Sequence, residues 1–202
     1  MLATRSAGKL RELRPLFRDA GIEVIDLVEA GIAESPLEES IESHPTFEEN
    51  ARAKAEYFYA LCGGLDVVAD DSGLSVDALG GEPGVRSKRW SGRMGSAHEV
   101  DAANNDKLVS SLSGVTVRRA QFVCAAAWRG EHGELVTMGS VEGTILTEPS
   151  GTHGFGYDPY FHASELGMTL ADATTEQKRQ VSHRGRAFDA LLAALRARGV
   201  IR

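Results

Sequence analysis

The sequence has only two cysteines, Cys62 and Cys124, and they stand at a probable helix end and in a probable strand. Their contexts predict neither a disulfide nor a cysteine metal site. No apolar run approaches the roughly 18 residues that a membrane helix needs. The N-terminus also lacks the basic flank and apolar stretch of a signal peptide. We therefore expect a cytoplasmic protein that makes no membrane contact.

The chain also lacks an excess of basic residues. Its formal net charge of -7 argues against a nucleic-acid surface, although a local basic cluster could still bind a small polyanion. Hydrophobic residues make up 42% and charged residues 25%, which is ordinary for a globular protein. With 202 residues, the chain suits a single domain, 1–202, with two lobes around a central cleft.

Apolar periodicity and capping signals predict alternating helices and strands. Helices are expected after Lys9, at the capping pairs Thr46–Glu49 and Ser96–Glu99, and after Ser182. Strands are expected at 1–4, 66–69, 121–128 and 134–146, the last two as an antiparallel hairpin. Proline and glycine predict connections at 29–45 and 79–93. The pattern indicates an α/β fold with a mixed, twisted sheet and flanking helices.

The segment from Thr4 to Lys9 reads TRSAGK and precedes a predicted helix. Helix N-termini bind anions, so Thr4, Ser6, backbone N–H groups and Lys9 could hold phosphate. The Walker pattern fails, because Ala3 stands where it needs glycine and Leu10 where it needs Ser or Thr. A solvent-exposed lysine with no ligand is the open alternative.

Asp70 and Asp71 follow the predicted strand 66–69 and are expected to open a turn, Asp70–Gly73. Neighbouring side chains alternate across a strand, so the two carboxylates should have different roles. A carboxylate that faces a triphosphate suits Mg²⁺. Glu42 is a second candidate ligand. The alternative is a simple turn that ends a strand.

Two further groups carry basic or aromatic side chains. Lys54 lies in the helix after Thr46 and could reach phosphates or simply face solvent. Lys178, His183 and Arg184 precede or begin the last helix and offer hydrogen-bond donors, unless they are ordinary surface charge. Local spacing indicates neither a Ser-His-Asp nor a Cys-His arrangement, so covalent catalysis is not expected.

The segment Phe155-Gly156-Tyr157-Asp158 places an aromatic ring beside a glycine that permits close approach. A nucleobase could stack on such a ring. A packed aromatic at a hairpin corner explains the same residues.

Taken together, these segments resemble the inosine/xanthosine triphosphate pyrophosphatase family over nearly the whole chain. The resemblance rests on Ala3-Thr4 with Gly8-Lys9, TFEENARAKA from Thr46, ADDSGLSVDALGGEPGV from Ala69, GFGYDPYF from Gly154 and SHRGRA from Ser182. It implies a hydrolase that converts ITP, dITP and XTP to the monophosphate and pyrophosphate with Mg²⁺, removing deaminated purine nucleotides from the precursor pool. It also implies a homodimer.

The resemblance also implies a role for each matching residue. Asp71 would be the catalytic base and, with Glu42, a metal ligand, with Asp70 beside it. The triphosphate would be bound by Thr4, Arg5, Ser6, Ala7, Gly8, Lys9 and Lys54. Ser72 would contact the substrate, and the base would be held by Phe155, Gly156, Tyr157, Asp158, Lys178, His183 and Arg184. Family members usually carry Asn where this chain has Ser6.

Two other functions stay open. One is a related pyrophosphatase that acts on modified pyrimidine or methylated nucleotides, which the Phe155 and Ser182–Arg184 segments disfavour. The other is a nucleotide-binding sensor without turnover, which Asp71, Lys9 and Lys54 disfavour.

Overall fold

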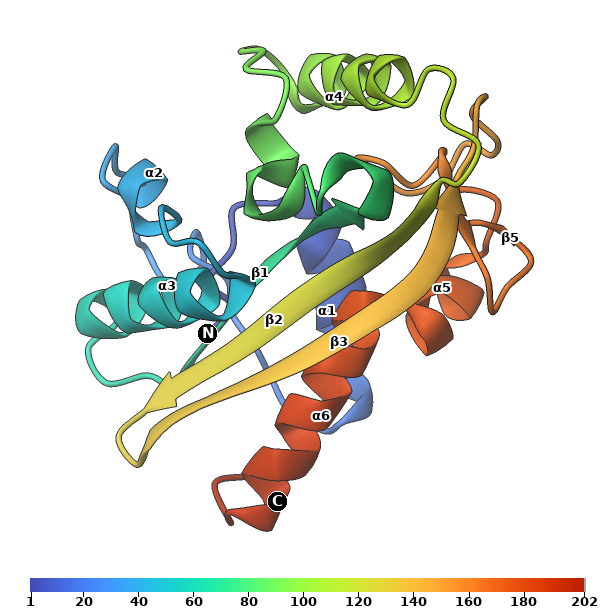
Figure 1. Ribbon diagram of the computed structural model, residues 1–202. Helices are drawn as coiled ribbons and strands as arrows, with labels where there is room; N and C mark the ends of the chain where they lie inside the picture. Colours follow the sequence, from blue (N-terminus) through green and yellow to red (C-terminus); the bar gives the residue numbers. More distant parts are fainter. Residues whose placement is uncertain (202) are drawn as a thin grey trace. The chain divides into compact units, whose positions relative to one another are not determined.

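A computed structural model describes residues 1–201, apart from the side chain of Glu39. Its elements, in chain order, are α1 (Ala7–Asp19), α2 (Glu38–Ile41), α3 (Phe47–Leu61), β1 (Val67–Val76), η1 (Asp77–Leu79), η2 (Gly84–Arg89), α4 (Ala97–Ser111), β2 (Arg119–Gly130), β3 (Gly133–Ile145), β4 (Phe161–Ala163), β5 (Met168–Thr169), α5 (Thr175–Val181) and α6 (His183–Ala197). The α/β class and flanking helices predicted from the sequence are confirmed (Figure 1).

The five strands form one sheet in the order β1-β2-β3-β4-β5. The predicted hairpin is confirmed as β2 and β3, drawn as the long yellow and orange pair in Figure 1. β4 pairs antiparallel with β3 and with β5. Leu2 adds parallel bridges to Asp26 and to Val68, so the backbone pairing runs in both directions.

The chain divides into two compact units. Unit 1 contains Met1–Asp71, Cys124–Gly139 and the C-terminal residues from His183. Unit 2 contains Ser72–Val123 and Ser140–Ser182. Each unit has its own hydrophobic core.

In unit 1, successive residues of the strands face two different layers. Val68, Cys124, Ala126 and Trp128 pack with α1 and α6, where the rings of Phe17 and Phe188 meet edge to face at 5.8 Å. The strand residues of opposite parity pack with α3, and these are Val67, Ala69, Ala125 and Ala127. The period-2 alternation of side chains in a strand therefore assigns α1 and α6 to one face and α3 to the other.

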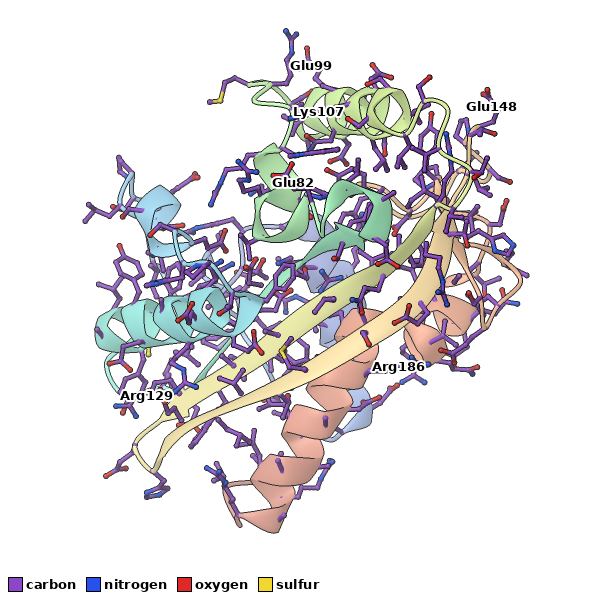
Figure 2. All side chains as sticks on the ribbon, in the orientation of Figure 1. Glu82, Glu99, Lys107, Arg129, Glu148 and Arg186 are labelled. Atoms are coloured by element: carbon purple, nitrogen blue, oxygen red, sulfur yellow. The ribbon has the colours of Figure 1, made fainter. Side chains whose placement is uncertain are left out.

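The α3 side of unit 1 is also held by Arg129, labelled in Figure 2. Its guanidinium lies 4.6 Å from the ring centroid of Tyr59 and its Nε lies 2.6 Å from a carboxylate oxygen of Glu56. Both partners belong to α3. This ion pair is partly exposed to solvent and adds little stability by itself. Most of the stability on this side comes from the apolar packing of α3 on the sheet.

In unit 2, the core joins α4 to the sheet through fully buried side chains such as Leu74, Leu108, Ile145 and Phe161. Ser96 and Glu99 form the predicted capping box at the start of α4. The loop Gly154–Asp158, which we call the aromatic loop, contributes Tyr157 to this core. α5 begins with a further capping box, Thr174 and Gln177, which is not among the predicted capping pairs.

Several predicted boundaries were wrong. Strand β1 continues from Val67 to Val76 instead of ending at a turn after Ala69. β1 is the neighbour of β2 in the sheet, so tertiary context outweighs the turn preference of Asp70–Gly73. The connections predicted at 29–45 and 79–93 contain the single-turn helix α2 and the 3₁₀ helix η2, and η1 ends at Leu79, where the second connection begins.

Candidate active site

The N-terminus of α1 begins three residues earlier than expected, at Ala7 instead of Leu10. Ser6 is the N-cap: its backbone is extended and its hydroxyl accepts a hydrogen bond from the Lys9 N–H at 3.4 Å. The Ser6 N–H in turn donates to the buried Thr4 hydroxyl at 3.2 Å. Ala7 and Gly8 occupy the first turn, where backbone N–H groups lack intrahelical partners and favour an anion.

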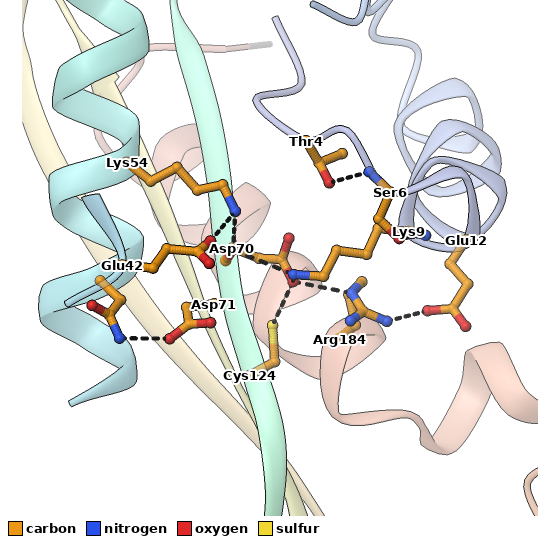
Figure 3. A network of polar contacts seen from close by, with 11 residues as sticks. Thr4, Ser6, Lys9, Glu12, Glu42, Lys54, Asp70, Asp71, Cys124 and Arg184 are labelled. Carbon is orange, nitrogen blue, oxygen red and sulfur yellow. Dashed lines mark hydrogen bonds and ion pairs between the residues drawn. The ribbon is translucent and has the colours of Figure 1, made fainter. Parts of the chain in front are cut away.

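Asp70 anchors the first polar cluster of unit 1 (Figure 3). One of its oxygens, Oδ2, lies 2.9 Å from Lys9 Nζ and 3.2 Å from Arg184 Nε. Arg184 also forms an ion pair with Glu12 of α1. The Asp70 and Arg184 side chains are almost completely buried, so α1, β1 and α6 are joined by paired charges. We call Lys9, Glu12, Asp70 and Arg184 the Asp70 cluster.

The charges around Asp70 determine its ionisation. Burial alone would raise the pKa of this carboxyl, but Lys9 and Arg184 outweigh it and hold the pKa well below its usual range. The buried Cys124 thiol lies 3.8 Å from Asp70 Oδ2. Burial, reinforced by the Asp70 charge, raises the pKa of Cys124, so this thiol is a poor nucleophile.

Asp71 projects to the α3 side of β1 and has a different environment. Its Oδ2 accepts a hydrogen bond from Asn50 Nδ2 at 2.9 Å. Burial, opposed by the Lys9 charge and reinforced by the Glu42 charge, raises the pKa of Asp71 to about 6. The predicted alternation is confirmed, because the Asp70 and Asp71 side chains contact different helices, although the two residues belong to a strand and not to a turn. Their different roles stay a prediction.

Glu42 and Lys54 form the second ion pair near Asp71. Lys54 Nζ lies 2.5 Å from Glu42 Oε1 and donates to the Asp70 carbonyl oxygen at 3.2 Å. Burial would raise the pKa of Glu42, but the Lys54 charge outweighs it and the net shift is downward. Burial likewise opposes the positive charge of Lys54, yet Glu42 and Asp70 raise its pKa. Both groups are therefore charged at neutral pH.

Lys9 and Lys54 converge although they come from different helices. Lys9 Nζ lies 3.5 Å from the Asp70 carbonyl oxygen, the same atom that Lys54 contacts. Two ammonium groups and the N-terminus of α1 thus surround the backbone next to Asp71. This arrangement can bind a group with several negative oxygens.

Arg5 and Ser72 have separate surroundings. The Arg5 guanidinium binds the carboxylate of Glu38, with a contact of 2.8 Å, and donates to the carbonyl oxygens of Ile32 and Ala33 at 3.0 Å each. The structure therefore places the side chain of Arg5 on the connection that leads to α2. Ser72 follows Asp71 in β1 and is half-buried.

The aromatic loop of unit 2 is fixed by α4 and by its own carboxylate. Asp158 Oδ2 accepts a hydrogen bond from the Phe155 N–H at 2.8 Å. The Gly156 N–H donates to Asp101 at 2.9 Å, and the Gly156 carbonyl accepts from Asn105 at 3.0 Å. The loop backbone therefore has a defined conformation.

Lys178 of α5 lies against this loop. Its Nζ is 2.7 Å from Asp158 Oδ2 and 5.0 Å from the centroid of the Phe155 ring. Both charged side chains are buried, while the Phe155 ring is half-buried. An aromatic face beside a buried acceptor and a buried donor suits a flat polar ring.

The side chains of Tyr157 and His183 are both buried, although the sequence predicted that they contact the base. The Tyr157 hydroxyl donates to the Ser87 carbonyl at 2.8 Å within the unit 2 core, and burial raises its pKa. His183 begins α6 in unit 1 and is buried beside Arg184.

Sequence reasoning missed three residues that hold these clusters together, namely Glu12, Asn50 and Asp101. Glu12 lies one helical turn after Gly8, and Asn50 lies one turn after the Thr46 cap. Asparagine is a weak helix former, so its place early in a predicted helix is a signal that the sequence does offer. The contacts of Glu12 and Asp101 join segments far apart in the sequence and leave no local pattern.

The donor set beside Asp71 is compatible with a magnesium ion. Mg²⁺ binds through one or two carboxylates together with phosphate oxygens and water. Lys54 Nζ contacts both Glu42 Oε1 and the carbonyl oxygen of Asp70, the residue before Asp71, so one ammonium group links the segments that carry the two carboxylates. The charge of Glu42 contributes to the raised pKa of Asp71. Among the described residues, no group of three or more His, Cys, Asp or Glu side chains is placed to hold a metal.

The described part of the chain contains no helix with the length and apolarity needed to cross a membrane.

Comparison with known proteins gives consistent matches over the chain. The family model described as "Ham1 family" matches residues 1–194. A dITP/XTP pyrophosphatase of Syntrophobacter fumaroxidans is 45% identical over 98% of this chain and 85% of its own. One of Mycobacterium tuberculosis is 47% identical over 98% and 95%. The Ham1 protein of Staphylococcus aureus, a solved structure, is 39% identical with a TM-score of 0.81 and coverage of 98% and 97%.

Proposed function

Because this chain belongs to the Ham1 family, we propose that it hydrolyses ITP, dITP and XTP to the nucleoside monophosphate and pyrophosphate, with Mg²⁺ as cofactor. The name dITP/XTP pyrophosphatase, carried by relatives 45% and 47% identical, supports a hydrolase of nucleoside triphosphate anhydride bonds. The role that follows is to remove deaminated purine nucleotides from the precursor pool.

One structural observation carries the proposal: the convergence of Lys9 and Lys54 on the Asp70 carbonyl, next to Asp71. The two ammonium groups bind phosphate oxygens, and the N-terminus of α1 adds backbone donors. Asp70 and Glu42 each pair with one of these lysines and keep it in place. The triphosphate thereby lies beside the carboxylate of Asp71.

Asp71 is the catalytic base in this proposal. With a pKa of about 6 it is mostly ionised at neutral pH, yet basic enough to take a proton from water. The water oxygen attacks the α-phosphorus, the bond to the bridging oxygen of pyrophosphate breaks, and Asp71 holds the proton. The ammonium groups of Lys9 and Lys54 stabilise the charge that develops on the phosphate oxygens.

Glu42 and Asp71 are the residues that would hold Mg²⁺. When bound, the ion would neutralise negative charge on the phosphates of the substrate. The two carboxylates repel each other when both are ionised. A bound cation would lower the free-energy cost of keeping both ionised, so the pair favours cation binding.

We assign base recognition to the aromatic loop and Lys178. The Phe155 ring offers a stacking surface, and the buried Asp158–Lys178 pair offers an acceptor and a donor. An ammonium donor matches the 6-oxo group of hypoxanthine or xanthine. The 6-amino group of adenine would leave this donor without an acceptor, at a cost of about 1–3 kcal/mol.

We further propose that the protein acts in the cytoplasm as a homodimer that binds neither nucleic acid nor membrane. Light scattering coupled to size exclusion would give twice the mass of one chain. A mass of one chain would overturn the dimer and leave the proposed activity untouched.

The test is a side-by-side hydrolysis assay with Mg²⁺ on ITP, XTP, dITP, GTP, ATP and dTTP that separates pyrophosphate from orthophosphate. The proposal requires pyrophosphate chiefly from ITP, dITP and XTP, and loss of activity in excess chelator. A preference for pyrimidine or methylated nucleotides would favour the related pyrophosphatases. Binding without turnover would favour a nucleotide sensor.

A further inference from the structure

Asn50 is a completely buried polar side chain in the second turn of α3. Its Nδ2 donates to Asp71 Oδ2 at 2.9 Å and to the His44 carbonyl at 3.2 Å. Its Oδ1 accepts from the His44 N–H at 2.8 Å. Both amide protons and the amide oxygen are therefore in use, which removes the cost of burying the group.

These partners allow only one orientation of the amide. A flipped amide would place Oδ1 against the Asp71 carboxylate and the His44 carbonyl, and Nδ2 against the His44 N–H. Each of the three contacts would then be repulsive. Asn50 thus always presents a donor to Asp71.

Asn50 and Lys54 stand one helical turn apart on the same face of α3. Asn50 contacts Asp71, and Lys54 contacts Glu42. The Asn50 side chain also binds the backbone of His44, which lies two residues after Glu42. One face of α3 therefore sets the positions of both carboxylates.

We propose that Asn50 is a positioning residue that fixes residues 42–46 against Asp71, so that Glu42 and Asp71 present their carboxylates to the substrate in one geometry. The inference rests on the proposed function, because it concerns the same reaction. Its effect is on turnover: misplacement of a reacting group by about 1 Å costs about 100-fold in rate.

Unit 2 contains a matched control in Asn104 of α4. This asparagine is also buried, and its amide makes three hydrogen bonds, to the backbone of Ser87, Lys88 and Ser91 at 3.2, 3.1 and 2.8 Å. All three of these partners are backbone groups, so this amide donates to carbonyl oxygens where that of Asn50 donates to a carboxylate. Replacement of either asparagine by alanine removes the same number of hydrogen bonds from a buried site.

The experiment compares wild type, Asn50→Ala and Asn104→Ala in melting temperature, kcat and KM for dITP. We expect similar losses in melting temperature, with kcat of Asn50→Ala down about 100-fold, KM within about threefold, and kcat of Asn104→Ala within about threefold of wild type. Near-normal kcat in Asn50→Ala, or an equal loss in Asn104→Ala, would overturn the inference. If Asn50→Ala does not fold, Asn50→Ser, which brings no charge beside Asp71 and is too short to make all three contacts, takes its place with the same expected loss of kcat.

Deuterium exchange of the substrate-free protein separates this inference from the proposed function. The backbone amides of residues 42–44 and of Thr46 should exchange faster in Asn50→Ala than in wild type and stay unchanged in Asn104→Ala. Unchanged exchange in Asn50→Ala would show that the side chain does not hold this segment. A wild type inactive on every triphosphate would instead overturn the proposed function, and the exchange result would still stand.

Discussion

Asp70 and Asp71 are consecutive in β1, but their carboxylates face different helices. Asp70 pairs with Lys9 of α1 and Arg184 of α6, whereas Asp71 accepts a hydrogen bond from Asn50 of α3. The pKa of Asp70 lies well below its usual range, and that of Asp71 is raised to about 6. The first carboxylate is suited to hold cations in place, and the second is suited to take up a proton.

Asp70→Asn and Asp71→Asn should therefore change stability in opposite directions at pH 8 in chelator. The lowered pKa of Asp70 stabilises the fold above the unfolded value of 3.8, so its replacement costs about 3–5 kcal/mol. The raised pKa of Asp71 means that its stabilising effect, present below pH 3.8, is lost as pH rises through about 6. Asp71→Asn should gain up to about 3 kcal/mol. Chemical denaturation measures the free energy of unfolding of both variants.

Repeating the denaturation at pH 4 tests the direction of the Asp71 effect. The gain in stability of Asp71→Asn over wild type should be smaller than at pH 8, because the carboxyl of native Asp71 is protonated at pH 4. A destabilised Asp71→Asn at pH 8 would contradict the electrostatic account of this strand.

Activity should fall as Asp71 takes up a proton. Since its pKa is about 6, kcat/KM measured at low magnesium should be constant near pH 8 and fall about tenfold per pH unit below about 6. Asp70 does not titrate in this range, because its pKa is lowered. Stopped assays between pH 5 and 9 give the profile. Full activity at pH 5 would rule out Asp71 as the base.

Lys9→Ala should weaken the binding of the triphosphate and of the transition state. Loss of one charged contact of about 1.5–3 kcal/mol lowers kcat/KM by roughly 10- to 100-fold. Lys88→Ala is the control, because Lys88 is an exposed lysine in η2. Steady-state kinetics on dITP compares them, and equal effects of the two variants would show that Lys9 has no specific role.

Gly154→Ala should damage recognition of the base more than Gly156→Ala. Both glycines have positive φ, of 80° and 62°, so both substitutions strain the backbone. A Cβ on Gly154 would also collide with the Asp158 carboxylate, whereas a Cβ on Gly156 meets nothing nearby. The ratio of kcat/KM for dITP over dATP should fall about tenfold further in Gly154→Ala. If the two variants have the same ratio, Asp158 has no role in recognition of the base.

Local signals in the sequence predicted most helices but misplaced the end of β1. The capping pair Thr46–Glu49 and the apolar periodicity of α3 act within a few residues, and both predictions were confirmed. Residues Asp70–Gly73 have turn propensity, yet they stay extended because β2, about 50 residues later in the chain, pairs with them. Such long-range pairing has no local signature.

The candidate site shows the same division. Lys9, Lys54, Asp70 and Asp71 could be singled out from residue type and context, and the structure brings them together within unit 1. The supporting side chains could not be singled out in this way. Glu12, for example, forms an ion pair with Arg184, which lies 172 positions later in the sequence. A pattern in one sequence indicates which residues carry charge, but the pairing of those charges depends on the fold.

The most direct test of the central claim is hydrolysis of dITP in water enriched in ¹⁸O, followed by mass spectrometry of both products. Attack at the α-phosphorus predicts one ¹⁸O atom in dIMP and none in pyrophosphate. Label in pyrophosphate would place the attack at the β-phosphorus, and release of labelled orthophosphate would place it at the γ-phosphorus. Either result would contradict the reaction proposed for Asp71.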